Sequence, residues 1–97
     1  MADYDPKPID TSGIALDPAL AELTEKLAEN AHDNWAVKRF KDGWTFGPSR
    51  EDASKRHPNL VAYSELSEAD KDLDRVTAME TIKAMLALGY EIRKRHL

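Results

Sequence analysis

The chain has 97 residues, the length of one small domain that can bury only a thin core. It contains no cysteine, which excludes a disulfide scaffold, a cysteine-type zinc finger and a thiol enzyme. Hydrophobic residues make up 41% and charged residues 33%, as in a folded globular protein, and the net charge of −4 argues against a dedicated nucleic-acid binder, which usually carries a basic face.

The first predicted element is a long helix that follows an N-terminal arm. Residues 1–16 contain two prolines, a glycine and three aspartates without an apolar period, so we expect a flexible arm. Asp17 and Pro18 are typical of a helix start, because Asp17 can cap free amides and proline suits the first helical position. Apolar residues then recur at three- and four-residue steps up to about Lys41, and Gly43 is the predicted stop. The recurring residues are Leu20, Leu23, Leu27, Ala28, Ala31 and Trp35.

The middle of the chain has the pattern of short extended pieces around a loop. Residues 44–46 are aromatic and β-branched and lie between two glycines, which predicts a short strand or an extended segment. Residues 48–59 are mostly polar and include two prolines, so we expect a surface loop there. Residues 60–63 are expected to return to the core as an extended piece.

A second helical region begins at Ser67, which forms a capping box with Asp70 in place of the usual glutamate. Helical spacing follows, and Gly89 is the predicted end. Because Asp74 could cap a fresh start, one long helix and a short helix followed by a longer one both fit residues 67–88. Residues 90–92 alternate like a last short strand, and residues 93–97 are a basic tail. The helically spaced residues are Leu73, Val76, Met79, Ile82, Met85 and Leu86.

These elements predict an α+β fold, mostly α, with two main packed helices and short β-strands, and one domain over residues 17–92. Trp44 is expected to fill the space between the two helices. The residues expected to be buried where the helices meet are Leu23, Leu27, Val76, Met79, Ile82 and Leu86.

Reactive side chains do not form a complete site in this sequence. His32 and Asp33 are an HD pair like that of metal-dependent phosphohydrolases, but those enzymes need an earlier histidine and His32 is the first in the chain. His57 and His96 fall in the loop and the tail, and Ser49 has no histidine partner. We therefore expect no metal, no cofactor and no enzymatic activity. No apolar run approaches the ~18 residues of a membrane span, so we also expect a cytoplasmic protein without membrane contact.

One stripe of the first helix combines groups that suit a flat anionic ligand. Ala28, His32, Trp35 and Arg39 are three or four residues apart and so share a helix face. An indole can stack on a nucleobase, and a guanidinium can bind phosphate through two hydrogen bonds. In the alternative interpretation, which the residue types favour, Trp35 fills the core and His32 hydrogen-bonds a nearby loop.

Several segments follow one another in an order that has a known counterpart. Residues 27–36 read LAENAHDNWA and residues 43–48 read GWTFGP. Later come HPNLV at 57–61 before Tyr63, Leu66-Ser67 opening a helix with Lys71 and Asp74-Arg75, and Glu80-Thr81 leading to ALGY at 87–90. Over residues 16–92 this order resembles the ryanodine receptor repeat, or RyR domain. Ala62 departs from it, because a proline is expected before the tyrosine.

The resemblance implies a fold and a type of ligand. In the giant calcium-release channels these repeats occur as tandem pairs, and each pair folds as one unit with pseudo-twofold symmetry. Family members have been associated with adenine-nucleotide binding at the cleft between paired repeats, where the tryptophan matching Trp35 stacks on the base. A chain with a single copy is expected to be a stand-alone prokaryotic or phage domain, and such copies look like nucleotide-sensing modules of defence systems.

Two functions of different classes remain open. In the first, the chain is a non-enzymatic homodimer that binds an adenine-nucleotide-like small molecule. Trp35 of each subunit then stacks on the base, Arg39 meets phosphate, and Asn30 and His32 hydrogen-bond base or ribose. In the second, it is a protein-interaction or structural module without a small ligand.

Overall fold

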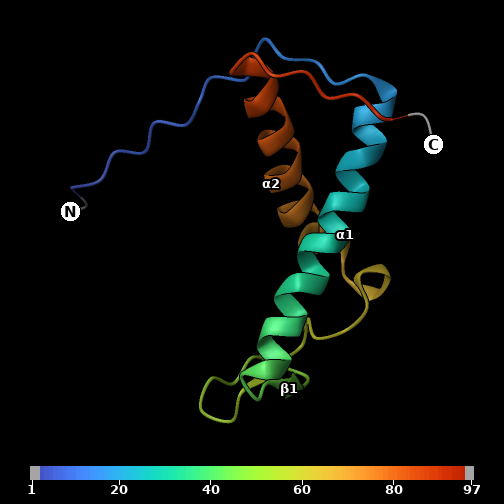
Figure 1. Ribbon diagram of the computed structural model, residues 1–97. Coiled ribbons are helices and arrows are strands. Elements are labelled where there is room, and N and C mark those ends of the chain that lie inside the picture. The colour runs from blue at the N-terminus through green and yellow to red at the C-terminus, as the bar shows by residue number, and fades with distance from the viewer. Residues whose placement is uncertain (1–2, 96–97) are drawn as a thin grey trace.

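The computed structural model describes residues 3–95 and is built around two long helices, α1 (Pro18–Lys41) and α2 (Glu68–Ala87), which pack against each other (Figure 1). Between them in sequence lie two short strands, β1 (Thr45–Phe46) and β2 (Arg56–His57), and the 3-10 helix η1 (Tyr63–Glu65). This composition confirms the predicted mostly α, α+β class. No helix within residues 3–95 has the length and apolar character needed to cross a membrane.

The two helices begin and end where the sequence predicts. The Asp17 carboxylate accepts a hydrogen bond of 2.9 Å from the backbone N–H three residues on, and Pro18 is the first helical residue. At α2, the Ser67 hydroxyl accepts from the N–H of Asp70 at 3.1 Å and donates to its carboxylate at 2.9 Å. Residues 68–87 form one helix, which settles the choice that the sequence left open.

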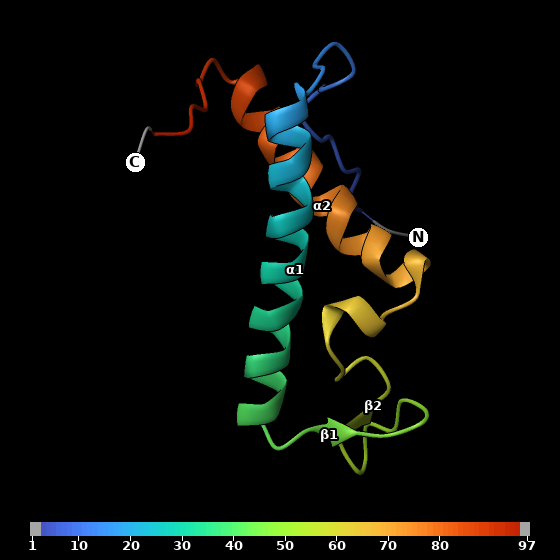
Figure 2. The same cartoon turned by 90° about the vertical axis from the view of Figure 1, so that its right-hand side faces the viewer.

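The strands β1 and β2 pair in parallel beyond the C-terminal end of α1 (Figure 2). Thr45 lies opposite Arg56, and Phe46 lies opposite His57. The predicted strand at residues 44–46 is thus confirmed, whereas the prediction of a plain loop over 48–59 is wrong because this segment contains β2. Arg56 and His57 lack the apolar alternation of a typical strand, and an isolated antiparallel bridge to Glu51 turns the chain back to reach β1.

The core lies where α1, η1 and α2 meet. Ala28 of α1 and Ile82 of α2 are completely buried. Val76, predicted to be in the core, is instead 53% exposed. It precedes the buried Ala78 by two residues, about 200° around the helix, so the two side chains point in nearly opposite directions. The other predicted core residues, Leu23, Leu27, Met79 and Leu86, are partly buried, and the remaining buried apolar side chains are Leu60, Tyr63 and Leu66.

Two further predictions about apolar segments are wrong. Trp44 does not lie between the helices. It is half-buried next to β1, where its ring neighbours are Arg39 and His57. Residues 90–92 do not form a strand, because β1 and β2 lie at the opposite end of the molecule and offer them no edge to pair with (Figure 2).

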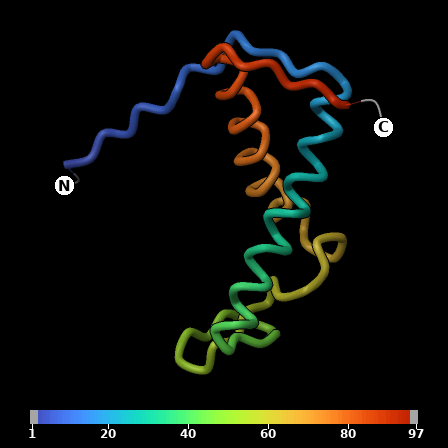
Figure 3. Tube along the Cα trace, in the orientation of Figure 1, coloured from blue at the N-terminus to red at the C-terminus, as the bar shows by residue number. Residues whose placement is uncertain are grey.

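The two terminal segments meet the helix pair at the end where α1 begins and α2 ends (Figure 1). The N-terminal arm extends away from the helices, and the segment after α2 crosses back towards the start of α1 (Figure 3). The arm is attached at Thr11, whose hydroxyl donates to the Glu80 carboxylate at 2.6 Å. Residues 1–2 of the predicted arm and residues 96–97 of the predicted basic tail lie outside the described residues.

Candidate functional site

The predicted stripe on α1 faces the rest of the protein. Ala28 and His32 are buried, and Trp35 and Arg39 are half-buried. Asn30, also a predicted site residue, is exposed. The spacing of three and four residues therefore brings His32, Trp35 and Arg39 together along one wall, and it leaves Asn30 outside that wall.

His32 joins α1 to the segment that precedes η1. Its Nε2 atom donates a hydrogen bond of 2.8 Å to the backbone carbonyl of Val61, and only 4% of the residue is exposed. Its ring lies between those of Trp35 and Tyr63, with centroid distances of 5.6 and 6.1 Å. This is the loop hydrogen bond that the alternative interpretation of the sequence predicts for His32.

His57 reaches the same wall from β2. Its ring meets the Trp35 indole edge-on, with a centroid distance of 5.0 Å and an interplanar angle of 76°. Its Nδ1 atom accepts a hydrogen bond of 3.0 Å from the backbone N–H of Asn59. In the neutral imidazole the proton is therefore on Nε2, which remains a hydrogen-bond donor.

Arg39 is fixed by the two tryptophans. Its guanidinium carbon lies 4.5 Å from the centroid of the Trp44 ring and 5.5 Å from that of Trp35. Such cation–π contacts reduce the rotamer freedom of a long side chain while leaving the N–H groups free to donate. Trp44 thereby contributes to the site indirectly, because it positions Arg39.

A cavity of about 180 Å³ lies between this wall and the start of α2. The first turns of α2 supply two carboxylates, and Leu66, the residue that follows η1, forms part of the wall. The residues that line the cavity are His32, Trp35, His57, Asn59, Leu66, Asp70, Leu73 and Asp74.

Charge is unevenly distributed around this cavity. Burial lowers the pKa of His57, and the positive charges of Arg50 and Arg39 lower it further, whereas the negative charges of Asp52 and Asp70 act in the opposite direction. Arg39 lies against the two tryptophans, and Arg50 forms an ion pair with Asp52 at 2.8 Å. Asp70 and Asp74 line the cavity from α2. A ligand that entered would meet aromatic rings on one side and carboxylates on the other, and no lysine or arginine is among the residues that line the cavity.

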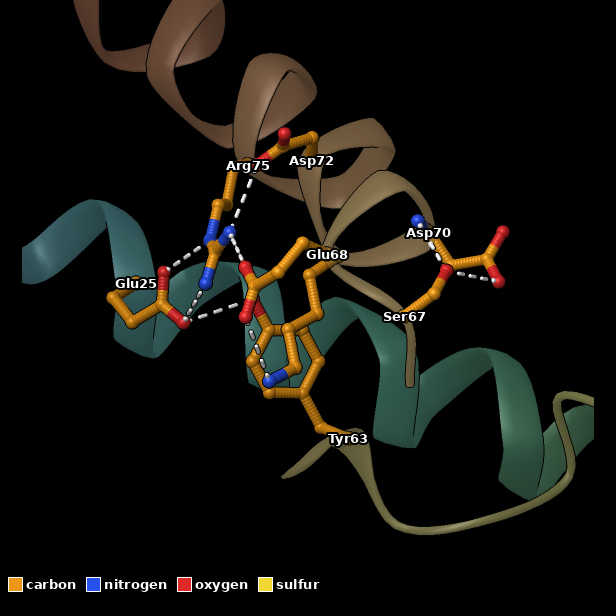
Figure 4. A network of polar contacts seen from close by, with 8 residues as sticks. Glu25, Tyr63, Ser67, Glu68, Asp70, Asp72 and Arg75 are labelled. Atoms are coloured by element: carbon orange, nitrogen blue, oxygen red, sulfur yellow. Dashed lines mark hydrogen bonds and ion pairs between the residues drawn. The ribbon is translucent and has the colours of Figure 1, made fainter. Parts of the chain in front are cut away.

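A network of charged side chains fixes the start of α2 against α1 (Figure 4). Arg75 donates to Glu25 of α1 at 2.7 and 3.1 Å, to Glu68 at 2.7 Å and to Asp72 at 2.8 Å. The hydroxyl of Tyr63 donates to Glu25 at 3.0 Å. These hydrogen bonds from Arg75 lower the pKa of Glu25, and burial raises the pKa of Tyr63.

The network lies next to the acidic side of the cavity. Arg75 is one residue away from Asp74, so its bonds to α1 fix the helix turns that carry Asp74 and Asp70. A weakened network would let the start of α2 move relative to His32 and Trp35. We infer that Arg75 positions the cavity without lining it.

Several residues around the cavity were not among the predicted site residues. The sequence indicates His57 only as a possible metal ligand, and Asp70 and Asp74 only as helix caps. The four-residue spacing of Asp70 and Asp74 places two carboxylates on one helix face, and this is the sequence feature that indicates an acidic side of the site. No sequence pattern indicated that this face would meet His57.

Groups of three or more His, Asp or Glu side chains that could hold a metal ion do not occur within residues 3–95. The cavity lining also contains no serine or threonine.

The fold and the cavity define a small, mostly helical domain with an aromatic and charged recess between its helices. The family model of the RyR domain matches residues 4–94, nearly the whole chain, and this protein therefore belongs to the RyR domain family. The resemblance seen in the sequence is thus confirmed.

Proposed function

We propose that this RyR domain is a non-enzymatic, homodimeric module that binds a nucleotide-like small molecule in the cavity beside Trp35. The observation that carries the proposal is the arrangement around the cavity. A half-buried indole, with Arg39 beside it, and two imidazoles lie opposite the carboxylates of Asp70 and Asp74. A nucleotide carries groups that match these side chains: a flat base that can stack, amine and hydroxyl groups that donate hydrogen bonds, and an anionic phosphate.

The size of the cavity suits one planar ring system. An apolar cavity of about 150 Å³ in another protein is large enough for benzene, and this one measures about 180 Å³. A nucleobase would fill it, and the sugar and phosphate would extend outside. Stacking on an aromatic side chain contributes about 1–3 kcal/mol per base, so Trp35 would supply a large share of the affinity.

The polar groups support a consistent orientation of the ligand. Asp70 and Asp74 can only accept hydrogen bonds when ionised, so they favour amine or hydroxyl groups on the ligand. Arg39 does not line the cavity, but its guanidinium lies 5.5 Å from the Trp35 ring, so it suits a phosphate that extends outside, which it can bind through two parallel hydrogen bonds. Asn30 does not line the cavity, and the proposal gives it no contact with the base.

Binding without catalysis fits the hydrogen bonds of the two histidines. His32 Nε2 donates to the carbonyl of Val61, and His57 Nδ1 accepts from the N–H of Asn59. Neither imidazole is paired with a hydroxyl nucleophile in the cavity lining, as a hydrolase of the serine type would require.

Tryptophan fluorescence tests the proposal directly. The chain has two tryptophans, so a Trp44→Phe variant leaves Trp35 as the only reporter. We expect adenosine, its mono-, di- and triphosphates or ADP-ribose to quench this signal, and a ligand at 100 times its dissociation constant to stabilise the fold by about 2.7 kcal/mol. The absence of both quenching and thermal stabilisation with all five compounds would reject the nucleotide proposal and favour the interaction module.

A pair of arginine and lysine variants tests the orientation. Arg39→Gln should weaken phosphate-bearing ligands and leave adenosine binding nearly unchanged. Lys41→Gln removes a positive charge from the same last turn of α1 and is the matched control. If both variants weaken binding equally, only the general positive charge matters and Arg39 has no specific role.

A further inference from the structure

A second cavity lies beside the start of α1, and it shares no lining residue with the cavity beside Trp35. Its volume is about 540 Å³, within the range of about 300–1,000 Å³ that is usual for binding pockets. The first turns of α1 form one side of it. The other side is the segment of residues 90–95, which crosses from the end of α2 towards the start of α1 (Figure 1). We call this second cavity the C-terminal groove.

Three aliphatic side chains form the apolar part of the C-terminal groove. Leu20 and Leu23 come from α1, and Ile92 comes from the segment after α2. All three are half-buried, whereas Glu91 and Arg93 on either side of Ile92 are exposed. A covered side chain between two exposed ones is the pattern of a strand with one face towards the protein. An apolar side chain that entered the groove would therefore meet aliphatic groups from both of its sides.

The backbone beside the groove is not paired with the rest of the chain. Within residues 3–95, no backbone–backbone hydrogen bond involves the N–H or C=O groups of residues 91–95. This segment is not helical, and the strands β1 and β2 lie at the opposite end of α1 (Figure 2). A row of unpaired backbone groups next to an apolar groove is the arrangement to which an extended peptide adds as a further strand.

Positive charge predominates on the segment that carries this backbone. Residues 91–95 contain three cations, Arg93, Lys94 and Arg95, and one carboxylate, that of Glu91. Among residues 3–95, the only ion pair of this segment joins Arg93 and Glu91 at 3.9 Å. Arg93 and Lys94 also line the groove. The segment therefore favours a ligand with negative charge.

The carboxylates on the α1 side of the groove are already engaged. The Glu22 carboxylate lies 3.9 Å from the ammonium group of Lys26. The Asp17 carboxylate caps α1 by accepting a hydrogen bond from the backbone N–H of Leu20. Neither carboxylate offsets the cations after α2, so the charge preference of the groove is set by residues 93–95.

We propose that the C-terminal groove binds an extended, acidic segment of another protein, which pairs with residues 91–95 as an added strand. Side chains alternate between the two faces of a strand. Apolar side chains of the bound segment lie against Leu20, Leu23 and Ile92, and the acidic side chains between them lie near the exposed cations. None of these residues belongs to the cavity beside Trp35, so the inference is independent of the proposed nucleotide site.

Synthetic peptides and the whole chain test this interaction by fluorescence anisotropy. The probe is a fluorescein-labelled peptide of alternating glutamate and valine, and we expect saturable binding. A peptide of alternating lysine and valine should bind at least about tenfold more weakly, because it places like charges together. Two further probes are N-methylated at all valines or at all glutamates, so each lacks the donors along one edge. One of these two should also bind at least about tenfold more weakly, since its backbone cannot pair with residues 91–95.

Two pairs of variants locate the binding site on the protein. Lys94→Gln should weaken binding about two- to fivefold, as expected for an exposed ion pair. Its matched control, Lys41→Gln, removes a positive charge at the other end of α1 and should have no effect. Ile92→Ser should weaken binding at least about fivefold because it removes apolar contact, whereas Leu88→Ser changes a residue that is 63% exposed and outside the groove. Circular dichroism checks that each variant is folded.

The same measurements can overturn the proposal. Equal binding of the glutamate and lysine peptides would reject the acidic partner, and full binding of both N-methylated probes would reject strand addition. Unchanged affinity in both Lys94→Gln and Ile92→Ser would place the peptide elsewhere. If the amide resonances of residues 91–95 shift with protein concentration in the absence of peptide, the groove binds a second copy, and its assignment to another protein is wrong.

Discussion

Replacing Ile82 by alanine should remove a large part of the stability of this small domain. Ile82 is 0% exposed and lies on the face of α2 that packs towards α1. The change deletes three buried carbon atoms, each worth about 0.8 kcal/mol of transfer free energy, or about 2.4 kcal/mol together. Incomplete collapse of the resulting cavity adds to this, so we expect a loss of about 3 kcal/mol. The total free energy of unfolding of a domain of this size is roughly 5–15 kcal/mol.

The control for this substitution is Val76→Ala on the same helix. Val76 is 53% exposed, and its truncation should cost at most about 0.5 kcal/mol. Both changes replace a β-branched residue by alanine, so the gain in helix propensity is similar and largely cancels in the comparison.

Urea unfolding followed by circular dichroism measures both free energies. Equal slopes with different midpoints would show that only stability has changed. The melting temperature of Ile82→Ala should fall by roughly 12–24 °C, at about 4–8 °C per kcal/mol for a domain of this length. If Val76→Ala is as costly as Ile82→Ala, α2 is rotated relative to the structure described above and the reasoning fails.

Three further substitutions or conditions give distinct expectations. Burial and nearby arginines lower the pKa of His57 from 6.5. As the pH falls below 6.5, the unfolded chain therefore binds more protons than the folded one. The free energy of unfolding should decrease from pH 7.5 to pH 5.5 as a result. A His57→Gln variant, followed by the same urea titrations, should show a flatter dependence, and an unchanged slope would contradict the assignment. Asp17→Ala removes the cap of α1, including its 2.9 Å bond, and should cost about 1 kcal/mol, whereas no loss would mean that α1 frays at this end. A Cβ atom on Gly47 would lie 2.7 Å from the Cβ of Arg56, so Gly47→Ala should destabilise the chain by about 1–3 kcal/mol and shift the amide resonances of β1 and β2; unchanged resonances would refute the close approach.

Helix boundaries were the part of the fold that the sequence predicted well. The residues at these boundaries act through local geometry, so their effect can be recognised without knowing what lies nearby. They are Asp17, Pro18, Gly43, Ser67 and Gly89. Val76 shows that such local signals do not identify the buried face of a helix. Apolar residues occur on both sides of α2, and only the packing against α1 decides which side is buried. The strand β2 was missed for a similar reason, since its two residues pair because the chain returns to β1.

The site was predictable only along α1. His32, Trp35 and Arg39 share one helix face, and the three- and four-residue spacing identifies them. The opposite side of the cavity comes from β2 and α2, which are brought near by contacts between distant parts of the chain, such as the bond between Arg75 and Glu25. Long-range contacts of this kind leave no period in the sequence.

The unequal distribution of buried residues has a consequence for how the molecule opens. Between residues 33 and 59 only Gly47 is buried, whereas the region where α1, η1 and α2 meet contains the buried side chains. Backbone amides are released to solvent by local openings whose free energy follows the buried contacts that must be broken. Amide hydrogens of β1 and β2 should therefore exchange through small local openings, while those around Ile82 should exchange only when the helix pair separates. His57 belongs to the first group, so the side of the cavity that it forms can open without unfolding the domain.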